Sequence, residues 1–307
     1  MSIRRVLNGA SLAISCFGAI VGCVGDSPAT TDAAAPPAST APAPTSTSKD
    51  AGLADVAVPV EDAARPDAAD AAPEFTPKSV RGLVLWLDPT VGVTEVAGKV
   101  SAWADTSTSA ISVTQSVAGN QPSKGTLGGK PVIAGTPTTW LEAQGATVGT
   151  KLDFATSDMT AEYVVALEVP STAALGGVLQ KIQGSPPFDG LQLYSNLGGG
   201  GKPGAGLDGA TLLLTGTSGN TGDGKLHLIC YRRVGTRLSL RLDGVELQSS
   251  TVALRSIDNT SPLYVGGRPD GVHATNQKFG DILIYKGSVS DAELQRLETY
   301  LKTKNGI

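Results

Sequence analysis

Acidic side chains are the first candidates for chemistry in this chain, because a pair of carboxylates facing one groove can cleave a glycosidic bond as nucleophile and general acid. Asp153 and Asp158 lie five positions apart and flank an expected turn, whereas Glu162 and Glu168 bracket a strand with an apolar interior. These positions are typical of solvated strand ends. We therefore expect no catalytic residues among them.

Histidine and cysteine offer few further candidates. His227 falls inside an expected strand and is interpreted as structural, while His273 falls in a polar loop. Cys230 alternates with apolar residues on one strand face, so we expect a buried thiol. No His/Cys/Asp cluster in the sequence has the spacing of a transition-metal site.

Aromatic and oxygen-bearing side chains provide the remaining candidates for a binding site. Trp86 lies in an apolar run and is expected in the core, but Trp103 and Trp140 could stack on a sugar ring. Carboxylate and amide oxygens are the ligands that calcium prefers, and calcium is the only cofactor that the sequence suggests. The candidate ligand-binding residues are Trp103, Trp140, Asp189, Arg268, Asp270, His273 and Asn276. The candidate calcium ligands are Asp189, Asp270, Asn276 and Asp281.

These candidates must be positioned by a β-rich scaffold. Short runs rich in Val, Leu, Ile and Tyr recur between Gly, Asp, Asn and Pro clusters, a rhythm typical of a sandwich or jelly roll. We expect strands at residues 83–87, 161–169, 177–182, 191–194, 211–215, 226–234, 237–242, 263–265 and 282–285. The predicted fold class is all-β, a two-sheet antiparallel sandwich.

Two local patterns predict where elements turn or end. Asp243-Gly244 follows a strictly alternating strand and favours a hairpin turn. Ser290 and Glu293 form a capping box ahead of leucines at helical spacing, and Gly306 follows the last turn. We therefore expect one short helix at the C-terminus.

The first 77 residues differ from the rest of the chain. Arg4 and Arg5 precede a short apolar stretch, which is the layout of a secretory signal and too short for a membrane-spanning helix. Residues 23–77 are dominated by Ala, Pro, Thr, Ser and Asp and cannot bury enough apolar surface to fold. We therefore divide the chain into a signal peptide at 1–22, a disordered tether at 23–77 and a β-sandwich domain at 78–307.

The excess negative charge lies in the tether. Residues 24–77 hold nine acidic and two basic residues, whereas the chain after residue 77 has 20 basic and 19 acidic residues. A nucleic-acid-binding domain would carry a basic excess. The sequence therefore excludes nucleic acid as a partner.

The end of the signal sequence resembles the lipobox of bacterial lipoproteins. Ile20-Val21-Gly22-Cys23 has an aliphatic residue, two small-to-medium residues and the cysteine that such proteins acylate. The resemblance implies cleavage before Cys23, its lipidation and durable membrane attachment through two or three acyl chains. Val24 is not the aspartate that retains some lipoproteins at the inner membrane, so the outer membrane is the expected location in the cell envelope.

The folded domain resembles laminin-G-like and concanavalin-A-like lectin domains of bacterial surface proteins. The resemblance rests on GLVLWLD at 82–88, GKVSAWAD at 98–105, the hairpin at 226–245 and FGDILIY at 279–285 with SDAE at 290–293. It implies a jelly roll whose relatives bind glycans, proteins or calcium and sometimes cleave polysaccharides. The chain lacks the Glu-x-Asp-x-x-Glu strand of the hydrolases and the paired Gln-x-His and Tyr-x-Lys strands of the lyases.

The sequence thus favours a membrane-anchored, non-catalytic lipoprotein that binds an extracellular glycan or a cell-surface protein on a rim of loops. Two other classes remain open, a structural or spacer lipoprotein without a small ligand, and a hydrolase or lyase without recognisable motifs. The oligomeric state is not predicted. A groove lined jointly by residues 188–206 and 268–278 would favour the first class.

Overall fold

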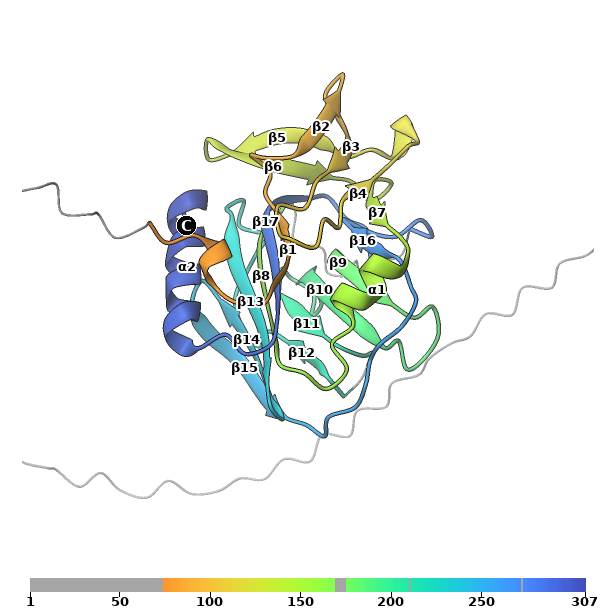
Figure 1. Ribbon diagram of the computed structural model, residues 1–307. Coiled ribbons are helices and arrows are strands. Elements are labelled where there is room, and N and C mark those ends of the chain that lie inside the picture. The colour runs from red at the N-terminus through yellow and green to blue at the C-terminus, as the bar shows by residue number, and fades with distance from the viewer. Residues whose placement is uncertain (1–73, 169–174, 210, 272) are drawn as a thin grey trace, which may run out of the picture. The chain divides into compact units, whose positions relative to one another are not determined.

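The structure is a computed structural model, and it describes residues 74–168, 175–209, 211–271 and 273–307 (Figure 1). The predictions of a signal peptide, of lipidation at Cys23 and of most of the tether fall on residues 1–73, outside the described residues. The strands are β1 (Leu83–Leu87), β2 (Val93–Val96), β3 (Lys99–Trp103), β4 (Val113–Thr114), β5 (Ser123–Leu127), β6 (Lys130–Gly135), β7 (Leu141–Ala143), β8 (Met159–Leu167), β9 (Gly176–Ile182), β10 (Gly190–Asn196), β11 (Gly204–Gly206), β12 (Leu213–Thr215), β13 (His227–Val234), β14 (Arg237–Leu242), β15 (Val245–Thr251), β16 (Leu263–Val265) and β17 (Gln277–Lys286). The helices are α1 (Ala146–Leu152) and α2 (Asp291–Asn305), with 3-10 turns at Pro77–Ser79 and Ala118–Asn120.

The first sheet of the sandwich is built around β8. This strand pairs with β13 on one side and β17 on the other, β13 continues through β14 to β15, and β17 continues to β1, all antiparallel. Every residue of β8 is buried. Burial of successive residues means that both faces of the first sheet are covered, since alternate side chains point to opposite faces.

The second sheet runs in the order β7, β16, β9, β10, β11 and β12. It joins the first sheet at one end, because β6 pairs with the start of β17 and β3 connects through β4 to β7. The strands therefore form one hydrogen-bonded network that folds into two layers. In Figure 1 the hairpins β2–β3 and β5–β6 lie together beyond one end of these layers.

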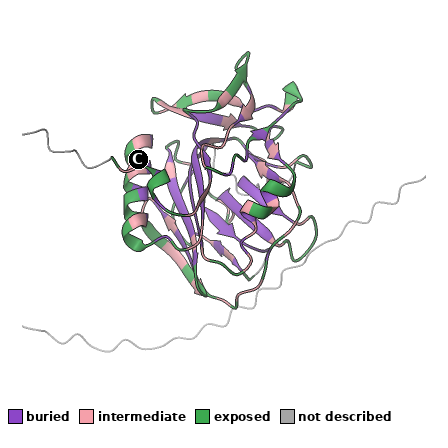
Figure 2. Ribbon diagram, in the orientation of Figure 1, coloured by how far each residue is buried: buried purple, intermediate pink, exposed green. Residues whose placement is uncertain are grey.

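The main apolar core lies between the two sheets, and Figure 2 shows that buried residues dominate the strands of both. Two tyrosines of the first sheet connect it to the second by hydrogen bonds. The Tyr163 hydroxyl donates to the Gly204 carbonyl at 3.0 Å, and the Tyr231 hydroxyl donates to the Leu212 carbonyl at 3.0 Å. These bonds satisfy buried phenols that would otherwise oppose packing of the two layers.

Helix α2 covers the outer face of the first sheet, where its buried leucines pack against outward side chains of β8, β13 and β17 in a second apolar cluster (Figure 1). At its start the Ser290 hydroxyl accepts from the Glu293 amide at 3.3 Å, and the Ser290 amide donates to Glu293 Oε2 at 2.8 Å. Gly306 ends the helix at a φ of 72°. The predicted C-terminal helix and its capping box are confirmed.

The predicted all-β sandwich is also confirmed. Strands β1 and β14 begin and end at the predicted residues. The turn from β14 to β15 places Asp243 and Gly244 at positive φ values of 52° and 91°, which is the geometry that favours Asp-Gly at hairpins.

The structure adds features that the sequence pattern does not predict. Helix α1 contains β-branched residues and a glycine, all of low helix propensity. We therefore attribute the formation of this helix to the burial of Val148 and Leu152. Phe75 and Pro77, assigned by composition to the tether, pack on the domain, and the Pro77 carbonyl accepts from the Tyr285 hydroxyl at 3.1 Å. No helix in the described part of the chain has the length and apolar character needed to cross a bilayer.

Candidate ligand-binding site

Polar and aromatic side chains gather on the outer face of the second sheet, beside the β16–β17 loop. Gln180 of β9 pairs with Gln192 of β10 and with Tyr264 of β16. Leu179 and Leu193 belong to the main core, so the adjacent glutamines face away from it. We call the following residues the rim cluster: Gln180, Gln192, Tyr194, Tyr264, Arg268 and His273.

One row of contacts joins two loops across the rim cluster. The Tyr194 hydroxyl donates to Gln192 Oε1 at 2.6 Å, and Gln192 Nε2 donates to the Phe188 carbonyl at 3.0 Å. The Tyr194 ring also meets the His273 ring edge-on, with the centroids 5.3 Å apart. The β9–β10 loop and the β16–β17 loop are therefore connected through the same polar side chains.

His273 is held in a defined orientation within this row. Its φ of 63° is in the left-handed region, and its carbonyl accepts from the Gly177 amide at 2.7 Å. Burial, reinforced by the nearby Arg268 guanidinium, lowers the pKa of His273 to about 4. The ring is therefore neutral at pH 7, and its Nδ1 accepts the 2.6 Å hydrogen bond from Gln180 Nε2.

Two polar atoms of the rim cluster have no hydrogen-bond partner in the described part of the chain. They are Gln180 Oε1 and Arg268 Nε, and both are buried. Arg268 Nη2 pairs with Asp270 at 3.0 Å, and the Asp270 side chain is 47% exposed. Gln180 is only 1% exposed, so neither atom lies at the open surface. Because buried polar atoms in proteins are nearly always bonded to protein or water, this acceptor and this donor are suited to bound water or to a ligand group that enters beneath the loop.

The β16–β17 loop carries several of the residues that the sequence nominates for ligand binding. Arg268 and His273 belong to the rim cluster, and Asp270 pairs with Arg268. Asn276 is exposed near the end of this loop. Trp140 is half-buried directly before β7, the neighbour of β16, and its role in binding stays a prediction.

Trp103 and Asp189 have other environments. Trp103 is fully buried and its Nε1 donates to the Asp88 carbonyl at 2.9 Å. The prediction that Trp103 could stack on a sugar is therefore wrong, because the core encloses the indole. The Asp189 carboxylate pairs with Arg255 at 2.5 Å, and Arg255 also binds Asp208 at 2.7 Å.

Asp281 is not available to calcium. It lies in β17 with no exposed surface, and it accepts from Trp86 Nε1 at 2.9 Å, Lys304 Nζ at 2.6 Å and Asn305 Nδ2 at 2.9 Å. A cation and two N–H donors thus occupy both carboxylate oxygens, and the prediction of Asp281 as a calcium ligand is wrong. The two other predicted carboxylates each pair with an arginine.

The four carboxylates considered for catalysis have different environments. Asp153 pairs with a buried lysine at 2.5 Å, Asp158 accepts from the Gly235 amide at 2.7 Å, and Glu168 is exposed. Glu162 is fully buried, so the expectation of a solvated strand end is wrong for this residue. Burial raises the pKa of the Glu162 carboxyl well above its usual value, because helix α2 and its apolar contacts exclude water from this face of β8.

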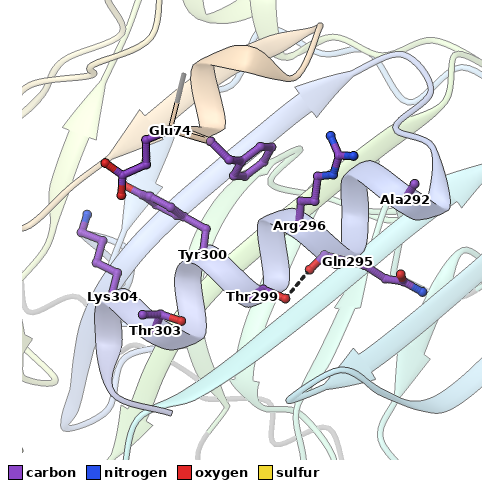
Figure 3. Close-up of a pocket in the computed structure, with 9 residues that line it drawn as sticks. Glu74, Ala292, Gln295, Arg296, Thr299, Tyr300, Thr303 and Lys304 are labelled. Carbon is purple, nitrogen blue, oxygen red and sulfur yellow. Dashed lines mark hydrogen bonds between the residues drawn. The ribbon is translucent and has the colours of Figure 1, made fainter. Parts of the chain in front are cut away.

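A groove of about 870 Å³ lies along α2 (Figure 3). Glu74, Tyr300 and Lys304 gather at one end of it in the close-up, and the remaining wall is formed by Phe75 and by helix residues that include Ala292, Gln295 and Arg296. The described residues that line the groove contribute no buried polar atom without a partner. We therefore regard the rim cluster, and not this groove, as the better candidate for ligand recognition.

His227 lies in a smaller groove between two carboxylates. Its Nδ1 is 2.8 Å from Asp243 Oδ2, and its Nε2 is 3.0 Å from Asp223 Oδ1. The hydrogen bond to Asp243 raises the pKa of His227 above its usual 6.5, burial opposes this increase, and Asp223 adds to it. The two histidines of the chain are therefore shifted in opposite directions.

Stability should consequently fall on both sides of pH 6.5. Because the folded-state pKa of His227 is raised, its stabilising contribution is complete below 6.5 and is lost as pH rises through the raised pKa. Because the folded-state pKa of His273 is depressed to about 4, the contribution of His273 to the free energy of unfolding is present above pH 6.5 and is lost as pH falls toward 4. Urea unfolding between about pH 5 and 8 should show that His227→Gln flattens the alkaline side and His273→Asn the acidic side. Unchanged profiles in both variants would contradict this assignment.

The glutamines and tyrosines of the rim cluster are not among the binding residues that the sequence pattern predicts. Gln192 and Tyr194 alternate with leucines inside an expected strand, which is the signal for side chains on the opposite face, whereas Gln180 lies between Leu179 and Lys181 and shows no such alternation. This alternation places a residue on a face but does not show which strands lie beside each other. Only the register of β9 with β10 and β16 brings these side chains together.

The chain matches no protein-family model and no curated protein. Solved structures do share its fold, among them the binding domain of Paraclostridial Mosquitocidal Protein 1, with a TM-score of 0.55, 14% identity and coverage of 71% of this chain and 52% of that one. The botulinum neurotoxin serotype D ligand binding domain, solved with N-acetylneuraminic acid, has a TM-score of 0.52, 10% identity and coverage of 72% and 52%. An arabinofuranosidase solved with arabinofuranosyl-alpha-1,2-xylobiose has a TM-score of 0.52, 14% identity and coverage of 67% and 51%.

The match spans about half the length of each of these structures. At these identities the likeness concerns the fold alone, which is a β-rich fold that also occurs in ligand-binding domains and in a carbohydrate-active enzyme.

Proposed function

We propose that this protein is a non-catalytic cell-envelope lipoprotein whose laminin-G-like or concanavalin-A-like sandwich binds a glycan at the rim cluster. The observation that carries the proposal is the pair of buried, unpartnered atoms Gln180 Oε1 and Arg268 Nε beside Tyr264 and His273. A sugar hydroxyl can donate to the first atom and accept from the second. Aromatic side chains next to such polar groups suit the apolar faces of a sugar ring.

The comparisons support a glycan over other small ligands. One of the similar structures is a toxin ligand binding domain in complex with N-acetylneuraminic acid, and another is an arabinofuranosidase in complex with an oligosaccharide. Both proteins were solved with a sugar ligand, but the match spans about half of each chain, and fold likeness alone does not transfer a site. The rim cluster supplies the site-specific part of the argument.

The proposal is tested by glycan-array retention of the full chain in mild detergent, with and without a calcium chelator. Arg268→Ala removes a charged donor, and the loss of a hydrogen bond to a charged group should weaken retention about tenfold or more. Arg296→Ala is the matched control, because it removes the same side chain from the α2 groove and leaves the rim cluster intact. If the calcium chelator abolishes retention of the parent protein on the array, calcium belongs to the site.

Two outcomes would contradict glycan binding at this site. The first is no retention across a broad panel, and the second is equal retention by the Arg268→Ala and Arg296→Ala variants. Specific retention of envelope proteins in place of glycans would show that the rim cluster recognises a protein.

The lipid anchor is the second part of the proposal. The lipobox-like run Ile20-Val21-Gly22-Cys23 and the following Val24 support acylation and outer-membrane placement, with the tether holding the domain away from the bilayer.

Replacing Cys23 with serine should release the protein from the membrane fraction while the domain stays folded. Each buried methylene of an acyl chain contributes about 0.8 kcal/mol to membrane affinity, so removal of two or three chains abolishes stable attachment. Fractionation of cells expressing either form measures this, with circular dichroism of the released form as the folding control. An unchanged distribution between membrane and soluble fractions would contradict the anchor.

A further inference from the structure

Three ionisable side chains meet between the first sheet and α2. Glu162 of β8 and Cys230 of β13 are directly opposed in the strand register, and Glu298 approaches them from the helix. One carboxylate or sulfur atom from each residue lies within 4.8 Å of those of the other two. The exposed fractions of the three residues are only 0%, 1% and 5%.

Glu162 is the unusual member of this cluster. Its carboxyl group interacts with the Cys230 thiol, but neither oxygen has a nitrogen or oxygen donor within hydrogen-bond distance, and the other side chains of the surrounding cluster are apolar. A buried carboxyl group whose nearest donor is a weak thiol is costly to ionise, and proteins rarely leave a buried polar group unsatisfied. Both oxygens of Glu162 are thus available as ligands for a bound group.

The chemistry of the cluster indicates which group it would hold. Arg241 donates to both oxygens of Glu298, at 2.7 Å and 3.2 Å, and so orients this carboxylate. Ionised Glu162, Cys230 and Glu298 carry three negative charges, of which Arg241 balances one and a divalent cation would balance two. A thiolate with two carboxylates suits zinc, and atoms this close to one another can surround an ion with bonds of about 2.0–2.3 Å.

We propose that Glu162, Cys230 and Glu298 form a zinc site that fastens α2 to the first sheet. The ligands come from β8, β13 and α2, so a bound ion would cross-link three elements that are far apart in the sequence. Three protein ligands leave the fourth position of a tetrahedral ion for a water molecule. The site is independent of glycan binding, because the rim cluster lies on the outer face of the other sheet.

Cobalt titration tests the site, because a thiolate ligand gives Co²⁺ a charge-transfer absorption in the near ultraviolet. The full chain carries Cys16→Ser and Cys23→Ser, so that Cys230 is the only thiol. We expect one Co²⁺ per chain with this absorption, and its loss when Zn²⁺ displaces the cobalt. Zn²⁺ at about 100 times its Kd should raise the Tm of the chelator-treated protein by roughly 5 °C or more.

Glu162→Gln separates metal binding from folding. The amide is a neutral isostere, so the metal-free variant should melt at or above the temperature of the metal-free parent, yet it should lose the zinc-dependent rise and bind Co²⁺ at least about tenfold more weakly. His227→Gln is the matched control, because it alters a different group of imidazole and carboxylates and should leave both signals unchanged. An equal zinc response in Glu162→Gln and the parent, or cobalt binding without the thiolate band, would overturn the proposal.

Discussion

Replacing Asp281 with alanine should lower the free energy of unfolding by about 3–5 kcal/mol, one of the two largest effects that we expect from a single substitution. The substitution leaves Trp86 Nε1 buried without its acceptor, leaves Asn305 Nδ2 with only the Leu301 carbonyl, and removes one of the two carboxylates that bind Lys304. The indole N–H then bears a desolvation cost without compensation, and the other two groups lose part of their compensation. Urea unfolding of the full chain, followed by circular dichroism, measures the change.

Asparagine should not rescue this position. Both oxygens of Asp281 accept from N–H donors or from a cation. An asparagine at this position has only one acceptor oxygen, and its N–H₂ group would point at groups that themselves donate. We expect Asp281→Asn to lose most of what Asp281→Ala loses. Glu95→Ala, on the exposed surface of β2, is the control and should stay within about 0.5 kcal/mol of the parent. A loss below about 1 kcal/mol for both Asp281 variants would refute the donor network.

The second large effect is expected at Trp103. Replacement with alanine should lower the free energy of unfolding by about 3–5 kcal/mol, because it removes a fully buried indole from a packed core and leaves the Asp88 carbonyl with only the Val91 amide as donor. Trp103→Phe should fall between alanine and the parent, since it keeps most of the apolar volume and loses only the hydrogen bond and part of the ring.

Trp140 provides the matched control for Trp103. Its side chain is only half-buried, so Trp140→Ala should cost less than half as much as Trp103→Ala in the same urea unfolding experiment. If it belongs to the glycan site, the same variant should also weaken retention on the array. Equal destabilisation by the two tryptophan variants would show that Trp103 is no more deeply packed than Trp140, which contradicts its place in the core.

The two proposed sites can be examined separately. The rim cluster faces away from the main core on β9, β10 and β16, whereas Glu162, Cys230 and Glu298 lie on the far side of the first sheet beneath α2. We therefore expect Arg268→Ala to leave cobalt binding unchanged. Likewise, Glu162→Gln should leave glycan retention unchanged.

Local features of this protein are determined by the sequence itself. The Asp243-Gly244 turn requires positive φ at two adjacent residues, and the capping box requires Ser290 and Glu293 at their spacing. Both depend on atoms only a few residues apart. The all-β class follows in the same way, since short runs rich in Val, Leu, Ile and Tyr recur between Gly, Asp, Asn and Pro clusters.

The surroundings of individual side chains were decided by the tertiary structure. Glu162 looks like a strand end in the sequence, but the helix more than a hundred residues later covers its face of β8. Trp103 looks available for stacking, but its neighbours in the fold enclose it. Gln180 meets Tyr264 and His273 only through the pairing of β9 with β16 and the path of the following loop. Burial and pairing depend on the register of strands that are distant along the chain, and no pattern within one strand contains that information.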